Sequence, residues 1–131
     1  LSMYVWFSQL GYPHNSLKFP YKRQSPLTKK NKEYKNIDDV TKDLYCLLNN
    51  FADSKFSLGR NLYFYIPLFA NPKWFADEKY NVILKEYNYM KNYNLPLAKT
   101  LDDADSFKLE MFDIITTEIN SIKEYLGEKN G

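Results

Sequence analysis

The amino-acid sequence predicts an α+β fold: a small, mostly antiparallel sheet of about three strands with three helices, the last two forming an antiparallel helix hairpin. Short runs of aromatic and β-branched residues at 4–7 and within 55–66 are typical of strands. Three longer stretches repeat apolar residues every three or four positions, as helices do. The chain has 131 residues and no linker-like stretch, so residues 1–131 are expected to form one domain.

The N-terminal run YVWF at 4–7 is apolar on both alternating faces, which predicts a strand buried on both sides. Gly11 and Pro13 then interrupt the pattern, and no periodicity resumes before Ile37. Residues 11–35 are therefore expected to be a long irregular segment. Irregular connections of this length within a domain commonly carry function.

A helix is predicted from Asn36 to about Phe51. Asn36 is a favourable N-cap residue, and Asp38 and Asp39 lie in the first turn, where the helix dipole favours acidic side chains. The apolar positions that recur at helical spacing are Ile37, Val40, Leu44, Leu47, Leu48 and Phe51.

Residues 55–66 predict a β-hairpin. Two β-prone runs, KFSL and NLYFYI, flank the dipeptide Gly59-Arg60, and a two-residue link containing glycine is typical of a tight turn. Pro67 has no N–H group to donate, so it is expected to mark a strand end or a sheet edge. Together with residues 4–7, this hairpin would complete a three-stranded sheet.

Two more helices are predicted in the last part of the chain. Asn71 and Pro72 combine an N-cap with a proline at the first helical position, which predicts a helix running to about Tyr93. The final helix is predicted over 101–126, with Gly127 ending it. Their apolar stripes have similar spacing, so the two helices are expected to pair, and helix 101–126 could also pair between two copies of the chain. The stripes are Ala76, Tyr80, Ile83, Leu84, Tyr87 and Met90 in the first, and Phe112, Ile115, Ile119, Ile122 and Leu126 in the second.

The composition disfavours most enzyme classes. One histidine and one cysteine cannot make a zinc site of the usual Cys/His kind. Thiol catalysis by Cys46 with His14 would need a thiol in the middle of a helix, on a polar face where nothing local activates it. The four glycines form neither a P-loop nor a dinucleotide-binding fingerprint. We therefore expect a protein without catalysis and without a cofactor.

Two acidic clusters have the residue types that could hold a metal ion. Both lie at predicted helix N-termini, where acidic residues are expected for dipole reasons alone, so no metal site is predicted. A small metal-dependent nuclease using the first cluster is the weakest of the alternative functions. The clusters are Asp38, Asp39 and Asp43, and Asp102, Asp103 and Asp105.

The segment 18–35 is the clearest functional signal. It carries seven of the eighteen basic residues and one of the sixteen acidic residues, a net charge of +6, so the rest of the chain is at −4. Its cations could neutralise phosphates or an acidic protein surface, and its aromatic rings could stack on unpaired bases. A solvated lysine-rich loop is the third interpretation. The binding residues predicted are Lys18, Phe19, Tyr21, Lys22, Arg23, Lys29, Lys30, Lys32, Tyr34 and Lys35.

Aromatic residues are more numerous than one small core requires, at 18% of the chain. Several of them lie off the main apolar stripes, which predicts either a second buried face or an interface with another protein. The possible interface residues are Tyr63, Tyr65, Trp74 and Tyr89.

The leading hypothesis is a small, non-catalytic binding or regulatory protein of the adaptor or inhibitor type, of a kind that mobile elements encode. It would dock on a macromolecular partner with an acidic surface, protein or nucleoprotein, through residues 18–35. A nucleic-acid-binding protein using the same segment is the first alternative. No membrane partner is expected, because no run of about 18 apolar residues occurs. A single cysteine fits a reducing compartment, so a cytoplasmic location is expected.

Overall fold

The structure, a computed structural model, describes residues 1–93 and 106–130. These residues contain five α-helices, one short 3₁₀ helix and one two-stranded antiparallel sheet. The α+β class is as predicted, and the arrangement differs from the predicted one. The elements in chain order are α1 (Ser2–Leu10), β1 (Tyr21–Gln24), β2 (Asn31–Tyr34), α2 (Ile37–Asn50), α3 (Leu58–Phe69), the short 3₁₀ helix η1 (Pro72–Phe75), α4 (Glu78–Asn92) and α5 (Ser106–Asn130).

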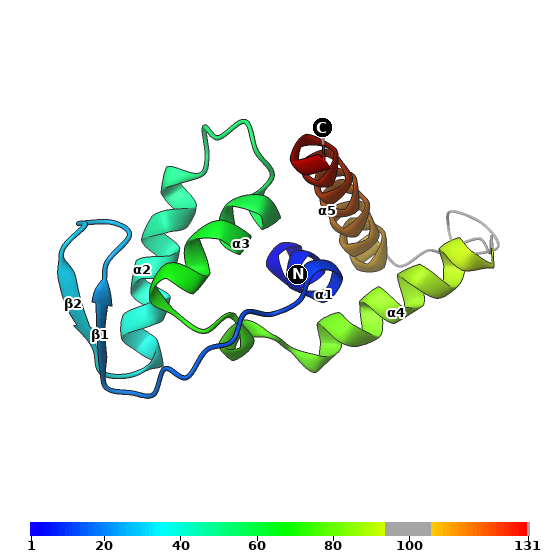
Figure 1. The fold of residues 1–131 in the computed structure, drawn as a ribbon. Helices are drawn as coiled ribbons and strands as arrows, with labels where there is room; N and C mark the ends of the chain where they lie inside the picture. The colour runs from blue at the N-terminus through cyan, green and yellow to red at the C-terminus, as the bar shows by residue number, and fades with distance from the viewer. Residues whose placement is uncertain (94–105, 131) are drawn as a thin grey trace.

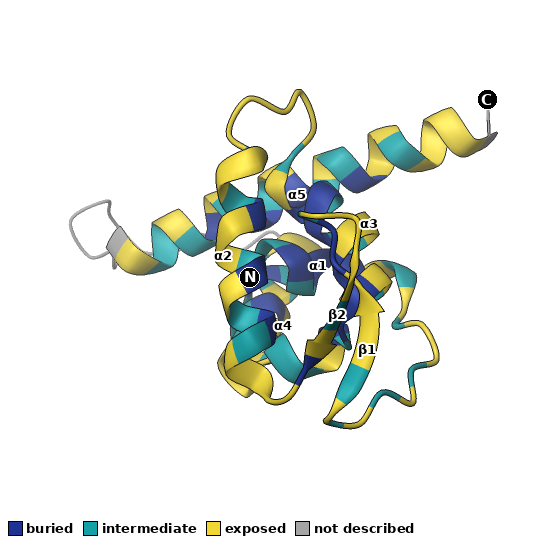
Figure 2. Cartoon of the chain, turned by 90° about the vertical axis from the view of Figure 1, so that its left-hand side faces the viewer, coloured by how far each residue is buried: buried dark blue, intermediate teal, exposed yellow. Residues whose placement is uncertain are grey.

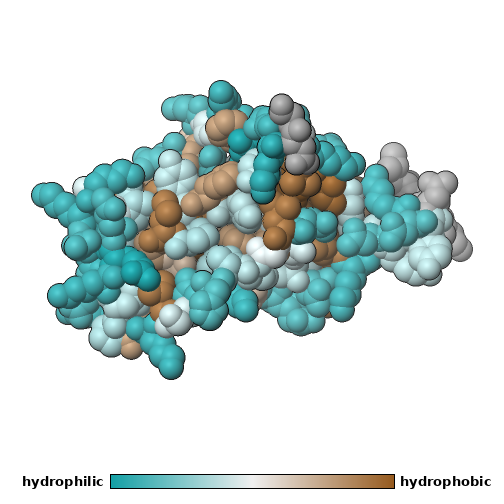
Figure 3. Space-filling model, viewed as in Figure 1, coloured by the Kyte–Doolittle hydropathy of each residue, from teal (hydrophilic) through white to brown (hydrophobic). Residues whose placement is uncertain are grey.

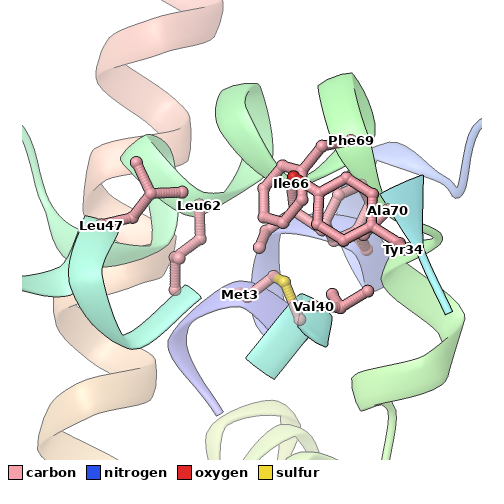
Figure 4. Close-up of a cluster of buried hydrophobic side chains, with 9 residues drawn as sticks. Met3, Tyr34, Val40, Leu47, Leu62, Ile66, Phe69 and Ala70 are labelled. Carbon is pink, nitrogen blue, oxygen red and sulfur yellow. The ribbon is translucent and has the colours of Figure 1, made fainter. Parts of the chain in front are cut away.

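Helix α1 lies in the middle of the molecule, with the β1–β2 hairpin and α2 on one side and α4 and α5 on the other (Figure 1). Two groups of buried apolar side chains meet there. Met3 and Phe7 of α1 join the group formed with β2, α2 and α3, which Figure 4 shows in close-up. Val5 and Trp6 join the group formed with α4 and α5. Helix α1 therefore connects the two halves of the core.

The prediction of a strand at residues 4–7 is wrong, because these residues form the middle of α1. Val5 and Trp6 are completely buried and Phe7 is nearly so, because core groups lie on both sides of the helix. A helix that is apolar all round is a buried one, and over so few residues its pattern matches that of a buried strand. Tertiary packing overrides the β propensity of these residues.

The prediction of a hairpin at 55–66 is also wrong, because the segment enters helix α3. Ser57 caps the helix by accepting a hydrogen bond from the Arg60 N–H at 3.2 Å. Gly59 lies in the buried first turn, where a Cβ would stand 2.5 Å from both Glu118 Oε1 and Trp6 Cδ1. Glycine is thus required by close packing rather than by a turn, and Pro67 lies inside the helix rather than at a strand end.

The sheet lies in the segment predicted to be irregular. Within 11–35 the antiparallel strands β1 and β2 form a hairpin, and residues 11–20 contain neither a helix nor a strand. The prediction of three strands is corrected to two for the described residues. The strands were missed because YKRQ and NKEY are polar and short, so they lack the apolar alternation that identifies a half-buried strand.

Helix α2 agrees with its prediction. The Asp39 N–H donates to Asn36 Oδ1 at 3.2 Å, and the Asp39 carboxylate accepts from the Lys35 N–H at 2.8 Å. The apolar stripe of α2 places Val40 and Leu47 in the core.

The helix predicted from Pro72 to about Tyr93 is divided into two. Asn71 caps η1 through the Lys73 N–H at 3.0 Å, as predicted, but the chain then leaves the helix at Ala76. Asp77 provides a second cap and starts α4. The sequence does contain a signal for this break, because Asp77 is a second favourable N-cap residue inside the helical pattern.

Helix α5 packs against both α1 and α4. Tyr87 of α4 meets the Phe112 ring edge-on, and its hydroxyl lies 3.0 Å from Thr116 Oγ1. The helix continues through Gly127, so the predicted stop there is wrong. Phe112, Ile115 and Ile122 are buried inside the chain, and pairing of two copies through this helix stays a prediction. The acidic cluster at 102, 103 and 105 lies outside the described residues.

Candidate docking surface on the basic hairpin

The hairpin has an inward and an outward face. Tyr21 pairs with Tyr34 across the strands, and Arg23 pairs with Lys32. Alternate residues point to opposite faces, so these four share one side, and Lys22 and Glu33 lie on the other. The tyrosine end of the first face is turned toward the core, and Figure 2 shows the rest of the hairpin mainly in the colour of exposed residues.

Asp43 of α2 attaches the hairpin to the body of the protein. Its carboxylate is buried and accepts from Tyr34 Oη at 2.7 Å, from Lys32 Nζ at 2.9 Å and from Ser25 Oγ at 3.4 Å. A buried carboxylate needs such partners, because its desolvation is costly. Tyr21 adds a second attachment by donating to the Phe69 carbonyl at 2.7 Å. Both strands are therefore held in a defined position.

The two tyrosine hydroxyls stay protonated at physiological pH. Burial raises the pKa of Tyr21 to about 12, against the usual value of 10. Burial, followed by the hydrogen bond to Asp43, raises the pKa of Tyr34 well above its usual value. Both hydroxyls therefore remain hydrogen-bond donors.

The turn between the strands is built by local hydrogen bonds. The Lys29 N–H donates to the Ser25 carbonyl at 2.9 Å, and the Ser25 N–H donates to the Lys30 carbonyl at 2.9 Å. The Gln24 side chain donates to the Lys29 carbonyl at 2.7 Å. Lys29 has a φ of 63°, a left-handed conformation that this network maintains. Pro26 is buried, so the turn is anchored while Lys29 and Lys30 point into solvent.

Six of the seven predicted cations are exposed and form no ion pair with any residue in the described ranges. Lys32 is the exception, because its ammonium group is paired with Asp43. Hydrophilic surface covers this end of the molecule, at the left of Figure 3. The exposed cations are Lys18, Lys22, Arg23, Lys29, Lys30 and Lys35.

The three aromatic residues predicted to bind mainly support the hairpin. Tyr34 is completely buried. Phe19 stacks on Trp74 of η1 with ring centroids 4.7 Å apart, and Tyr21 contacts the same indole at 6.0 Å. The charge of the segment is therefore presented to solvent, while most of its aromatic surface is used to hold it in place.

The four possible interface residues do not form one surface. Trp74 lies under the hairpin, and Tyr63 is half-buried against Trp6 and Phe7 of α1. Tyr89 is exposed near the end of α4, far from the hairpin in Figure 1. Tyr65 is exposed on α3, beside a cleft described below.

The carboxylates of α2 do not converge. Asp43 is turned toward the hairpin, and Asp39 accepts from the backbone of Lys35. Within 1–93 and 106–130 no three His, Cys, Asp or Glu side chains gather in a way that could hold a metal ion. In the same ranges no helix is both long and apolar enough to cross a bilayer.

Sequence reasoning missed one buried polar group in the core. Glu118 of α5 is 3% exposed and accepts from Ser57 Oγ at 2.6 Å, Trp6 Nε1 at 2.9 Å and the Gly59 N–H at 3.2 Å. It connects α5, α1 and the N-terminus of α3. Its position between Ile115 and Ile119, inside the apolar stripe, was the available signal.

Comparison of the chain with protein-family models, with curated proteins and with solved structures finds no match.

Proposed function

We propose that this chain is a small, non-catalytic binding or regulatory protein, of the adaptor or inhibitor type, that docks on an acidic macromolecular surface through its basic hairpin. The proposed partner is a protein or nucleoprotein in the cytoplasm. Binding of the hairpin to nucleic acid alone is the alternative, and the cleft described in the next subsection favours it.

One observation carries the proposal: four exposed cations lie on a hairpin whose own position is determined by a buried anchor, and two more flank it, Lys18 before β1 and Lys35 after β2. A solvated lysine-rich loop needs no such anchor. Here the Asp43 carboxylate neutralises only Lys32, the cation closest to the core, and leaves the others available. Preorganised charge of one sign attracts a partner of the opposite sign and orients it during the encounter.

The experiment compares two variants that lose the same charge. The hairpin variant carries Lys18→Gln, Lys22→Gln and Lys30→Gln, and the control carries the same change at Lys85, Lys123 and Lys129. All six side chains are exposed and none forms an ion pair with a described residue. Lys32 is retained because it holds Asp43, and Lys29 is retained because it borders the cleft.

We expect the wild-type protein and the control to capture the same partner from cells that contain it, and the hairpin variant to lose that partner. On immobilised poly-glutamate at about 50 mM salt, the wild-type protein and the control should be retained more strongly than the hairpin variant. Retention should be weaker at about 200 mM salt, because exposed charges are screened within about 10 Å at such ionic strengths. Equal loss in both variants would show that only net charge matters, and the proposal would then fail.

A further inference from the structure

A cleft of about 450 Å³ lies beside the hairpin turn. It is bordered by the end of α2, the connection from α2 to α3, the start of α3 and the turn itself. Lys29 comes from the turn, Phe51 and Phe56 from the connection, and Asn61 and Tyr65 from α3. Figure 1 shows α2 between the hairpin and α3, with the connection from α2 to α3 at the top of the view. The cleft is thus continuous with the cationic surface.

A buried amide without a partner borders this cleft. Asn61 is only 8% exposed, and its Nδ2 group has no hydrogen-bond partner among the described residues. Buried side-chain donors are almost always paired, and an unpaired one lowers stability. An unpaired buried amide at the edge of a cleft is a candidate hydrogen-bonding group for a ligand.

The rest of the lining indicates what kind of ligand this is. The Phe51 and Tyr65 rings lie 5.3 Å apart between centroids, and Phe56 is 40% exposed. Two cations lie against the Phe56 ring: the Arg60 guanidinium, which is also paired with Glu128 at 3.2 Å, is 4.0 Å from the ring centre, and the Lys55 ammonium is 5.1 Å from it. Lys29 borders the cleft itself. Aromatic walls, an amide and nearby cations are the groups that bind an unpaired base and its phosphate. An acidic peptide would use the cations but not the aromatic walls.

We propose that the cleft takes one unpaired base of a single-stranded nucleic acid, whose phosphates run along the exposed cations of the hairpin. The proposal rests on the docking role proposed for the hairpin, because the same cations attract the strand, and it takes the alternative in which the partner is nucleic acid. Asn61 would hydrogen-bond the edge of the base, since an asparagine amide offers both a donor and an acceptor.

The test measures fluorescence anisotropy of labelled single-stranded oligomers of about 12 nucleotides, a length within the site sizes of such proteins. Phe56→Ala removes a wall of the cleft, and Phe64→Ala is the matched control, since Phe64 is 44% exposed and lies outside this cleft. Because stacking of one base on an aromatic ring is commonly decisive, we expect Phe56→Ala to weaken binding roughly 5- to 150-fold and Phe64→Ala to change it less than about twofold.

Two further variants keep the test decisive if Phe56→Ala unfolds. Asn61→Ala should weaken binding about 3- to 10-fold without lowering the thermal midpoint, because the Nδ2 group it removes has no hydrogen-bond partner in the part of the chain that the structure describes. Asn50→Trp should block the cleft from its exposed edge at the end of α2.

The outcomes separate this inference from the proposed function. If the hairpin variant binds oligomers poorly and all cleft variants bind normally, the base-binding cleft is overturned and docking by the hairpin stands. If no oligomer binds at about 50 mM salt while cells yield a protein partner that the hairpin variant loses, nucleic acid is overturned and an acidic protein is the partner. A lower thermal midpoint for Asn61→Ala would assign the amide a structural role and also overturn the inference.

Discussion

Removing the hydroxyl group in Tyr34→Phe should weaken the attachment of the hairpin to Asp43, its main anchor. In the wild-type protein Tyr34 Oη donates to Asp43 Oδ2 at 2.7 Å, and both side chains are buried. The variant leaves Oδ2 with only the 3.4 Å contact to Ser25, while Oδ1 keeps Lys32. A hydrogen bond to a buried charged group contributes about 1.5–3 kcal/mol, so we expect a loss of about 2 kcal/mol in the free energy of unfolding.

This loss can be converted into a shift of the thermal midpoint. The entropy of unfolding is about 2.1 cal/mol/K per residue, so a domain of this length should lose about 7 °C. Tyr21→Phe is the matched control, because its hydroxyl donates to the neutral carbonyl of Phe69 at a similar distance and is only half-buried. It should cost about 1 kcal/mol, near 3–4 °C.

Urea denaturation and thermal unfolding monitored by circular dichroism measure both variants. If Tyr34→Phe costs less than about 0.5 kcal/mol, or less than Tyr21→Phe, then Asp43 is not the main anchor and the reasoning is refuted. Binding of the unidentified partner by Tyr34→Phe is expected to weaken as well, since the cations would no longer be held in position.

The remaining predictions concern packing and pH. Gly59→Ala should lower the free energy of unfolding by about 3 kcal/mol or more, because its Cβ would stand 2.5 Å from Glu118 Oε1. Gly127→Ala, in open space within α5, is the control and should raise the free energy of unfolding by about 0.5–1 kcal/mol. Thermal unfolding measures both, and similar effects from the two would contradict the close packing at Gly59. Stability should fall as pH rises from about 10 through 12, because the folded protein holds the Tyr21 and Tyr34 protons more tightly than the unfolded chain does. The double variant with phenylalanine at both positions should lose less stability over this range, and an unchanged pH profile would show that neither phenol is responsible.

Helix α2 shows how much of the fold could be predicted locally. Its start at Asn36, its cap and its buried stripe depend on residues that lie within one or two turns of each other. The caps of η1 and the surplus of cations in 18–35 are local in the same sense. Sequence patterns predict such features because the interacting groups are neighbours in the chain.

Helices α1 and α3 show why other elements could not be predicted. The positions of Trp6 and Gly59 depend on hydrogen bonds that both donate to Glu118, which lies more than fifty residues away in the sequence. β propensity in both segments indicated strands, and the burial of helices on several sides outweighed it. The Asn61 cleft is similar, because its walls come from three separate elements.

The sequence by itself determined the cap of α2 and the concentration of basic residues in one segment, because each follows from composition or short-range pattern. The α+β class was predicted correctly, but from two segments that form helices. Only the tertiary structure decided that this segment contains an anchored hairpin, that Lys32 forms the ion pair with Asp43, and that the six other cations stay exposed. The physical reason is burial: which polar groups must be paired depends on which surfaces come together, and that is settled by contacts between distant parts of the chain.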